Sequence, residues 1–151
     1  MATVAIERNI DAPTSIQVKD LRLGPMPVVV PGALNVTLKA NVTRELPDLV
    51  NVKVTVRKWH QGRWHRLPCL ARTWGSCKYQ SVGTCVLFEQ LIACPLERRY
   101  YHINYTLNFG EPGSWARPFL TGSYRATIKV RHPHTYRVLA CLRALFALAT
   151  L

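Results

Sequence analysis

The sequence predicts an all-β protein, a β-sandwich with at most one short helix. Apolar and polar residues alternate over many stretches, which is the period of a half-buried strand. Glycine, proline and asparagine separate these stretches at short intervals, as in sandwich folds of about seven strands. The length of 151 residues provides one hydrophobic core, so we expect a single domain over 1–151.

The first half of the chain contains most of the clear strand patterns. In the first strand, the alternation of apolar and polar residues shifts by one residue at Asp20, which predicts a β-bulge there. Gln61-Gly62 is typical of a hairpin turn between the last two strands of this half. Strands are expected at 16–23, 28–30, 34–42, 52–59 and 64–67.

The second half begins with the one stretch that favours a helix, at 82–92, where a few apolar residues have helical spacing. Strands follow at 101–109, 122–130 and 136–142. The apolar segment 138–151 contains Arg143 and is too short to span a bilayer, so we interpret it as the last strand plus a tail.

Four of the five cysteines lie close together, which indicates either disulfides or a metal site. Zinc ligands come in pairs two to four residues apart, whereas the gaps here are about eight to nine residues and contain no suitably spaced histidine. Disulfides, and therefore an oxidising compartment, are the favoured interpretation; no metal or cofactor is expected. The clustered residues are Cys69, Cys77, Cys85 and Cys94.

Three glycosylation sequons support an extracytoplasmic protein. Asn35, Asn41 and Asn104 each begin an Asn-X-Thr motif, and each falls on the polar phase of its expected strand. The first residues lack the basic start and apolar run of a signal peptide. For a secreted or lysosomal protein, we therefore expect that the signal was removed or is missing from this sequence.

A formal net charge of +12 predicts attraction to polyanions, although scattered lysines and arginines also suit a solvated face. Nucleic acid is disfavoured because the sequons and cysteines indicate an extracellular protein. An enzyme is disfavoured because the eight acidic residues form no obvious pair and no nucleophile motif or phosphate-binding loop is present.

Several short motifs, in this order and spacing, resemble the ML-type (lipid-recognition) domain family and its ganglioside-activator branch. The resemblance covers 7–151, nearly the whole chain. Its motifs are 28–32 with Asn35-Val36-Thr37, 62–69 with Gly75-Ser76-Cys77, Cys94-Pro95 before 101–106, Ser114-Trp115 before 121–125, and Leu139-Ala140-Cys141.

The resemblance implies an immunoglobulin-like β-sandwich opened into a cup, with a lipid cavity between its sheets. It implies a non-enzymatic protein that holds a glycolipid, phospholipid or sterol and presents it to a lipid-processing hydrolase or a receptor. A module that binds anionic glycans or membrane surfaces through its basic face is the alternative. The residues expected to line the cavity are Val36, Leu38, Val54, Val56, Ile103, Tyr105, Leu107, Phe119, Tyr124 and Ile128.

Family members place aromatic residues at the cavity mouth, where they touch a membrane transiently. Trp64 and Trp115 occupy the matching positions here, and Arg63 and Arg66 would meet anionic lipids. The indole ring suits such an interface because its body is apolar and its N–H is polar.

The resemblance also implies the disulfides Cys69–Cys77 and Cys85–Cys94. Two departures affect these expectations. The family's N-terminal cysteine is absent near 9–11, so we expect Cys141 to be a free, largely buried thiol rather than half of a disulfide. The extra disulfide loop of ganglioside activators is also absent between Cys85 and Cys94, which leaves the identity of the lipid open.

Overall fold

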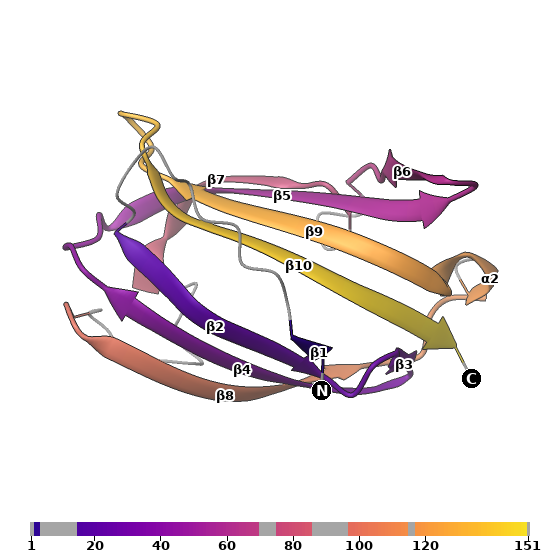
Figure 1. Cartoon of the computed structure of the whole chain (residues 1–151). Coiled ribbons are helices and arrows are strands. Elements are labelled where there is room, and N and C mark those ends of the chain that lie inside the picture. The colour runs from indigo at the N-terminus through magenta and orange to yellow at the C-terminus, as the bar shows by residue number, and fades with distance from the viewer. Residues whose placement is uncertain (1, 4–14, 70–74, 86–96, 115–116, 151) are drawn as a thin grey trace.

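The computed structural model has two β-sheets that face one another (Figure 1), as the sequence predicts. It describes residues 2–3, 15–69, 75–85, 97–114 and 117–150. Among these residues, the helix described in full is a single four-residue turn, α2 (Arg117–Leu120), and Thr84 and Cys85 are also helical. No helix within the described ranges is long and apolar enough to cross a membrane.

The first sheet has the strand order β1-β2-β4-β8 and is antiparallel throughout. Its central strands β2 and β4 expose polar side chains on one face and turn apolar side chains toward the second sheet. Its strands are β1 (Ala2–Thr3), β2 (Ile16–Gly24), β4 (Gly32–Val42) and β8 (Tyr100–Phe109).

The second sheet has the order β3-β10-β9-β5-β6, and β7 pairs with the first part of β5. All its pairings are antiparallel except the one between β3 and β10. Its strands are β3 (Val28–Val30), β5 (Leu49–His60), β6 (Arg63–Arg66), β7 (Lys78–Gly83), β9 (Gly122–Arg131) and β10 (Val138–Thr150).

Two local predictions are confirmed in detail. The pairing of β2 with β4 shifts register between Val18 and Asp20, as the slipped alternation predicts for a bulge. Gln61 and Gly62 both have positive φ, 49° and 82°, between β5 and β6. A two-residue turn of this kind matches the twist of the strands it joins, so it fixes the hairpin register that pairs Trp59 with Trp64.

Two element boundaries differ from the prediction. The last strand does not end at 142, because β10 pairs with β9 as far as Leu148 and with β3 up to Thr150. The helix predicted at 82–92 starts too early, because Val82 and Gly83 belong to β7 and pair with β5. Thr84 and Cys85 are helical, as predicted, and the rest of the predicted helix, 86–92, lies outside the described residues.

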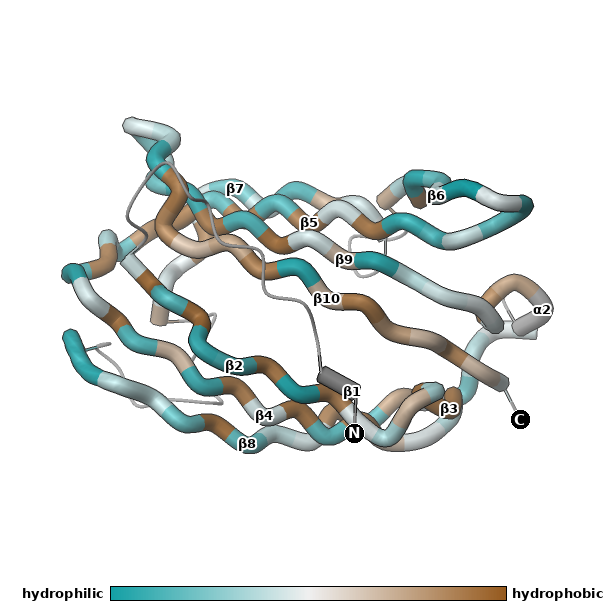
Figure 2. Tube along the Cα trace, in the orientation of Figure 1, coloured by the Kyte–Doolittle hydropathy of each residue, from teal (hydrophilic) through white to brown (hydrophobic). Residues whose placement is uncertain are grey.

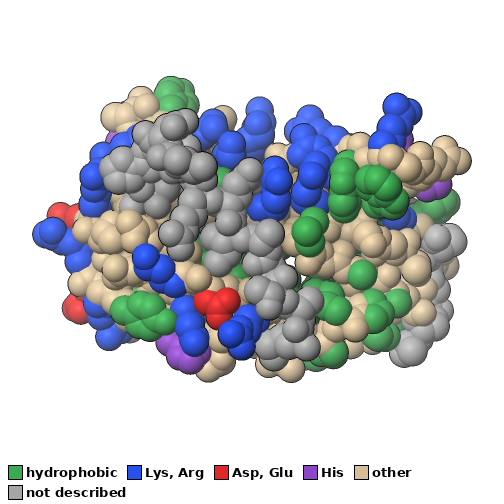
Figure 3. Space-filling model, in the orientation of Figure 1, with side chains coloured by type: hydrophobic (Ala, Val, Ile, Leu, Met, Phe, Trp, Pro, Cys, Tyr) green, Lys and Arg blue, Asp and Glu red, His purple; other side chains and the backbone are tan. Residues whose placement is uncertain are grey.

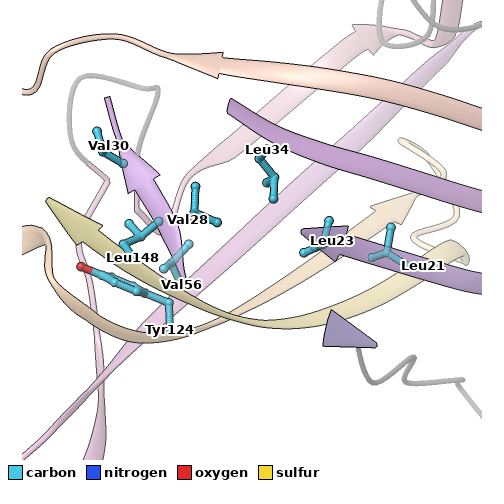
Figure 4. Close-up of a cluster of buried hydrophobic side chains, with 8 residues drawn as sticks. All are labelled: Leu21, Leu23, Val28, Val30, Leu34, Val56, Tyr124 and Leu148. Carbon is cyan, nitrogen blue, oxygen red and sulfur yellow. The ribbon is translucent and has the colours of Figure 1, made fainter. Parts of the chain in front are cut away.

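Apolar side chains from both sheets meet in the interior, and brown and teal segments alternate along the strands in Figure 2. A small cluster of Val50, Val52 and Leu139 fills one end of the sandwich. A larger cluster lies near the other end, where Figure 4 shows its side chains converging from β2, β3, β4, β5, β9 and β10. Its members are Leu21, Leu23, Val28, Val30, Leu34, Val56, Tyr124 and Leu148.

Candidate functional site: an apolar pocket between the sheets

A pocket of about 390 Å³ lies between the two sheets, beside the larger core cluster. Every side chain that lines it is apolar. The first sheet contributes from β2, β4 and β8, the second from β3, β9 and β10, and α2 contributes one residue. The lining residues are Leu21, Leu23, Val28, Val30, Leu34, Val36, Leu107, Phe109, Leu120, Ala126, Ile128, Leu142, Ala144, Phe146 and Leu148.

The space exists partly because small side chains lie opposite one another in the second sheet. Ala126 of β9 and Ala144 of β10 are register partners, and both line the pocket. Directly paired residues have Cβ atoms only about 5 Å apart on the same face of a sheet. Two methyl groups therefore leave open a volume that larger side chains would fill.

The short helix α2 is held against the second sheet by its carbonyl groups. The Tyr124 hydroxyl donates a hydrogen bond to the Leu120 carbonyl at 2.7 Å, and the Lys58 ammonium donates one to the Phe119 carbonyl. The Tyr124 ring stacks on Phe146 with a centroid distance of 5.5 Å. Burial raises the pKa of Tyr124, so the phenol remains a donor. These contacts keep Leu120 in the pocket wall.

The pocket reaches the molecular surface at β8. Leu107 lines the pocket and is also 40% exposed, because β8 is an edge strand of its sheet. Phe119 of α2 is 69% exposed. Figure 3 shows apolar side chains on the right-hand half of the face it displays, at the α2 end of the molecule, and Lys and Arg side chains along its upper part.

The chemistry of the pocket suits an apolar ligand. Its volume lies within the range of roughly 300–1,000 Å³ that is typical of small-molecule sites. A polar group placed there would lose its hydrogen bonds to water and gain none from the lining side chains. The lining also offers no acid, base or nucleophile to a bound molecule. Such a lining suits the binding and shelter of an apolar molecule.

The structure places the ten predicted cavity residues in several environments. Three of them, Val36, Leu107 and Ile128, line the pocket. Val56 and Tyr124 are buried members of the adjoining core cluster, and Leu38 and Val54 pack against it. Ile103 and Tyr105 lie half-buried on β8, opposite Leu38 and Val36 respectively, and Phe119 is exposed.

Sequence reasoning missed all of the lining contributed by β2, β3 and β10. The signal in β10 was present, because apolar residues occupy every even position from Leu142 to Leu148. The interpretation of its second half as a tail hid that pattern. Val28 and Val30 were assigned to a strand, but nothing in the sequence shows that this strand pairs in parallel with β10.

The predicted mouth residues are only partly described. Trp64 lies half-buried on β6, in an edge-to-face contact with Trp59 at 5.3 Å. The Arg125 guanidinium lies 4.9 Å from the centre of the Trp64 ring. These contacts place Trp64 on the outer face of the second sheet. Arg63 and Arg66 are exposed on the same hairpin, and Trp115 lies outside the described residues.

The disulfide Cys69–Cys77 is confirmed, with its Cα atoms 4.8 Å apart. It closes a loop that is anchored on β5, because Val54 donates its N–H to the Cys77 carbonyl and Val56 donates its N–H to the Ser76 hydroxyl. Gly75 has φ +93°, and a Cβ there would overlap the Pro68 carbonyl oxygen. This loop therefore requires glycine at that position.

The other cysteines are placed less completely. Cys85 is disulfide-bonded, and Cys94, its expected partner, lies outside the described residues. Cys141 is half-buried on β10, opposite Lys129 of β9.

Two of the three sequons lie side by side on the outer face of the first sheet. Thr106 donates its hydroxyl to the Asn35 amide oxygen at 3.1 Å, and Thr37 donates to the Asn104 amide oxygen at 3.0 Å. Asn35 and Asn104 are exposed, whereas Asn41 is half-buried. The two exposed sequons are therefore joined reciprocally: the threonine of each sequon donates a hydrogen bond to the asparagine of the other sequon.

The chain is similar in sequence to a curated protein. The chain is 30% identical to the mouse (Mus musculus) ganglioside GM2 activator over 128 residues, which cover 72% of this chain. The match spans only 63% of the length of that relative. No protein-family model matches the sequence.

The fold agrees with this likeness. A Niemann-Pick type C2 protein from the Japanese carpenter ant superposes with a TM-score of 0.52, at 12% identity, over 91% of this chain and 96% of that one. The mouse activator and the ant protein are both ML-domain proteins. The resemblance to the lipid-recognition family and the predicted immunoglobulin-like sandwich are therefore confirmed.

Proposed function

We propose that this chain, which resembles the lipid-recognition family in sequence and in fold, is a non-enzymatic protein that binds and transfers a membrane lipid. The single observation that carries this proposal is the wholly apolar pocket between the sheets. The proposed ligand is a glycolipid of the ganglioside class, in keeping with the name of the mouse relative. A phospholipid or a sterol would use the same apolar lining.

The pocket supplies affinity by removing hydrocarbon from water. Each buried methylene contributes roughly 0.8 kcal/mol, so about ten methylenes contribute on the order of 8 kcal/mol before the cost of immobilising the chain. The lining side chains would also regain dispersion contacts that an empty space lacks. The polar head group has no partner inside, so it stays in solvent at the exposed end near Leu107.

Transfer requires contact with a membrane, and exposed apolar side chains support it. Phe119 of α2 and Trp59 of the β5–β6 hairpin are 69% and 46% exposed. Aromatic rings of this kind partition into the interfacial layer of a bilayer. The lipid would then be presented to a hydrolase or a receptor, in a secreted or lysosomal compartment where the Cys69–Cys77 disulfide persists.

Titration with a fluorescently labelled sphingolipid tests the proposal. The label should gain intensity and shift to shorter wavelength with saturable binding, because its chain leaves water. A matched probe with the same label and head group but no acyl chain serves as the control. Equal binding of both probes would show that the apolar pocket is not the binding site.

A further inference from the structure

We propose that the outer face of the second sheet is a binding site for a linear sulphated glycan. This site lies on the side of the sheet that faces away from the pocket, so it is separate from the lipid-binding function proposed above. It is a shallow groove of about 300 Å³. Its lining residues are Lys53, Thr55, Arg57, Thr127, Lys129, Arg131 and Arg143.

Strand register arranges these cations in two rows across the sheet. Lys53 of β5 lies opposite Lys78 of β7 on one side and Lys129 of β9 on the other. Four residues further along β5, Arg57 lies in the same way between two arginines, Arg66 of β6 and Arg125 of β9. Like charges directly opposite one another on adjacent strands are destabilising.

Within the described strands of this sheet, no acidic side chain neutralises these rows. Its strands hold ten of the 20 lysines and arginines of the chain and no aspartate or glutamate. The Arg22–Asp20 ion pair lies on the other sheet. The Nε atoms of Arg125 and Arg131 are buried without a hydrogen-bond partner among the described residues. An external anion would offset this repulsion at the charged ends of the side chains that line the groove.

The dimensions favour a polymer over a small anion. The rows are four residues apart along β5, about 13 Å at the usual rise of a strand. Between them, Thr55 and Thr127 lie opposite one another and Arg143 lies beside Thr127. A single phosphate or sulphate touches one row only, whereas a chain with repeated anionic groups contacts both rows and the threonine hydroxyls between them.

The same surface suits a glycan better than other polyanions. The Cys69–Cys77 disulfide indicates an oxidising compartment, where sulphated glycans rather than nucleic acids are the polyanions at hand. Bases of a single strand would need exposed aromatic rings to stack on, and the side chains lining the groove include none. A membrane would meet the exposed rings of Phe119 and Trp59, whereas the groove itself is lined by Lys, Arg and Thr side chains.

Binding of a heparin octasaccharide, measured by titration calorimetry at several salt concentrations, tests the proposal. The site variant combines Lys53→Gln, Arg57→Gln and Lys129→Gln. The matched control removes equal charge from the first sheet and the loop that follows it, with Lys19→Gln, Lys39→Gln and Arg44→Gln. Thermal melting confirms that each variant is folded, and vesicles with and without phosphatidylserine form a second binding arm.

We expect the site variant to bind the octasaccharide about tenfold more weakly, because it loses three charge contacts. The control should stay within about twofold, and added salt should weaken wild-type binding as screening increases. Equal losses in both variants would overturn the proposal, because net charge alone would explain the binding. The proposal would also fail if the site variant lost binding to anionic vesicles and kept its binding to the octasaccharide. Uptake of labelled lipid by the site variant should be unchanged, so this outcome is separable from the lipid proposal.

Discussion

The hydroxyl of Tyr124 donates a hydrogen bond to the carbonyl of Leu120 at 2.7 Å, and this bond joins the second sheet to the wall of the pocket. Tyr124 is a buried core residue of β9, whereas Leu120 ends α2 and lines the pocket. The bond therefore couples the packing of the core to the position of a side chain that would contact the lipid.

The burial of Tyr124 predicts a loss of stability at alkaline pH. The phenol has a pKa near 10 when unfolded, and burial raises the pKa of Tyr124 in the folded protein. Below pH 10 the phenol is protonated in both the folded and the unfolded state, so its full contribution to the free energy of unfolding is present. As pH rises from 10 through the folded-state pKa, unfolding releases a proton and stability falls. Urea unfolding between pH 8 and pH 11 should show a steeper decline for wild type than for Tyr124→Phe. Tyr136→Phe, at a residue 68% exposed, should behave as wild type; a matching change there would refute the assignment.

Filling the pocket should block lipid uptake without unfolding the protein. Ala144→Trp places an indole in the space beside Ala126, which wild type leaves to the ligand. Uptake of labelled lipid should fall by about tenfold or more, while the melting temperature stays similar because a void, not a packed core, is being filled. Ala33→Trp at an exposed position of β4 is the control and should retain uptake. Normal uptake by Ala144→Trp would place the lipid elsewhere.

Removing the Cys69–Cys77 disulfide should destabilise the fold. The bond spans a sequence separation of 8 residues. The chain-entropy estimate for a loop of this size is about 2–3 kcal/mol. Because the loop bonds to Val54 and Val56 of β5, the combined change Cys69→Ala and Cys77→Ala should lower the free energy of unfolding by about that amount. Denaturant titration measures it. An unchanged midpoint would mean that the loop is held by its hydrogen bonds alone.

The paired sequons predict glycans on the first sheet. Asn35 and Asn104 are exposed on the outer face of β4 and β8, so their side chains are accessible to an added sugar. Protein from a eukaryotic secretory host should lose mass on treatment with peptide N-glycosidase. Asn35→Gln and Asn104→Gln should each reduce that loss, whereas Asn108→Gln, outside any sequon, should not. No mass change in wild type would argue against passage through the secretory pathway.

Local patterns predicted more of this fold than of its pocket. The bulge at Asp20 and the turn at Gln61-Gly62 depend on neighbouring residues, and both are confirmed. Pocket lining depends on which strands lie opposite one another, and period-two alternation within a strand does not determine how strands are arranged in space. Ala144 and Phe146 were therefore assigned to a tail, and Trp64 was placed at a cavity mouth although its ring contacts lie on the outer sheet face.

The most direct test of lipid binding is native mass spectrometry of the protein purified from a eukaryotic secretory host. We expect a population heavier than the polypeptide and its glycans by the mass of one lipid, which organic solvent extracts and tandem mass spectrometry identifies. Ala144→Trp should lack that population, and Ala33→Trp should retain it. A wild-type protein that carries no lipid, and acquires none after incubation with mixed ganglioside and phospholipid vesicles, would contradict the central claim.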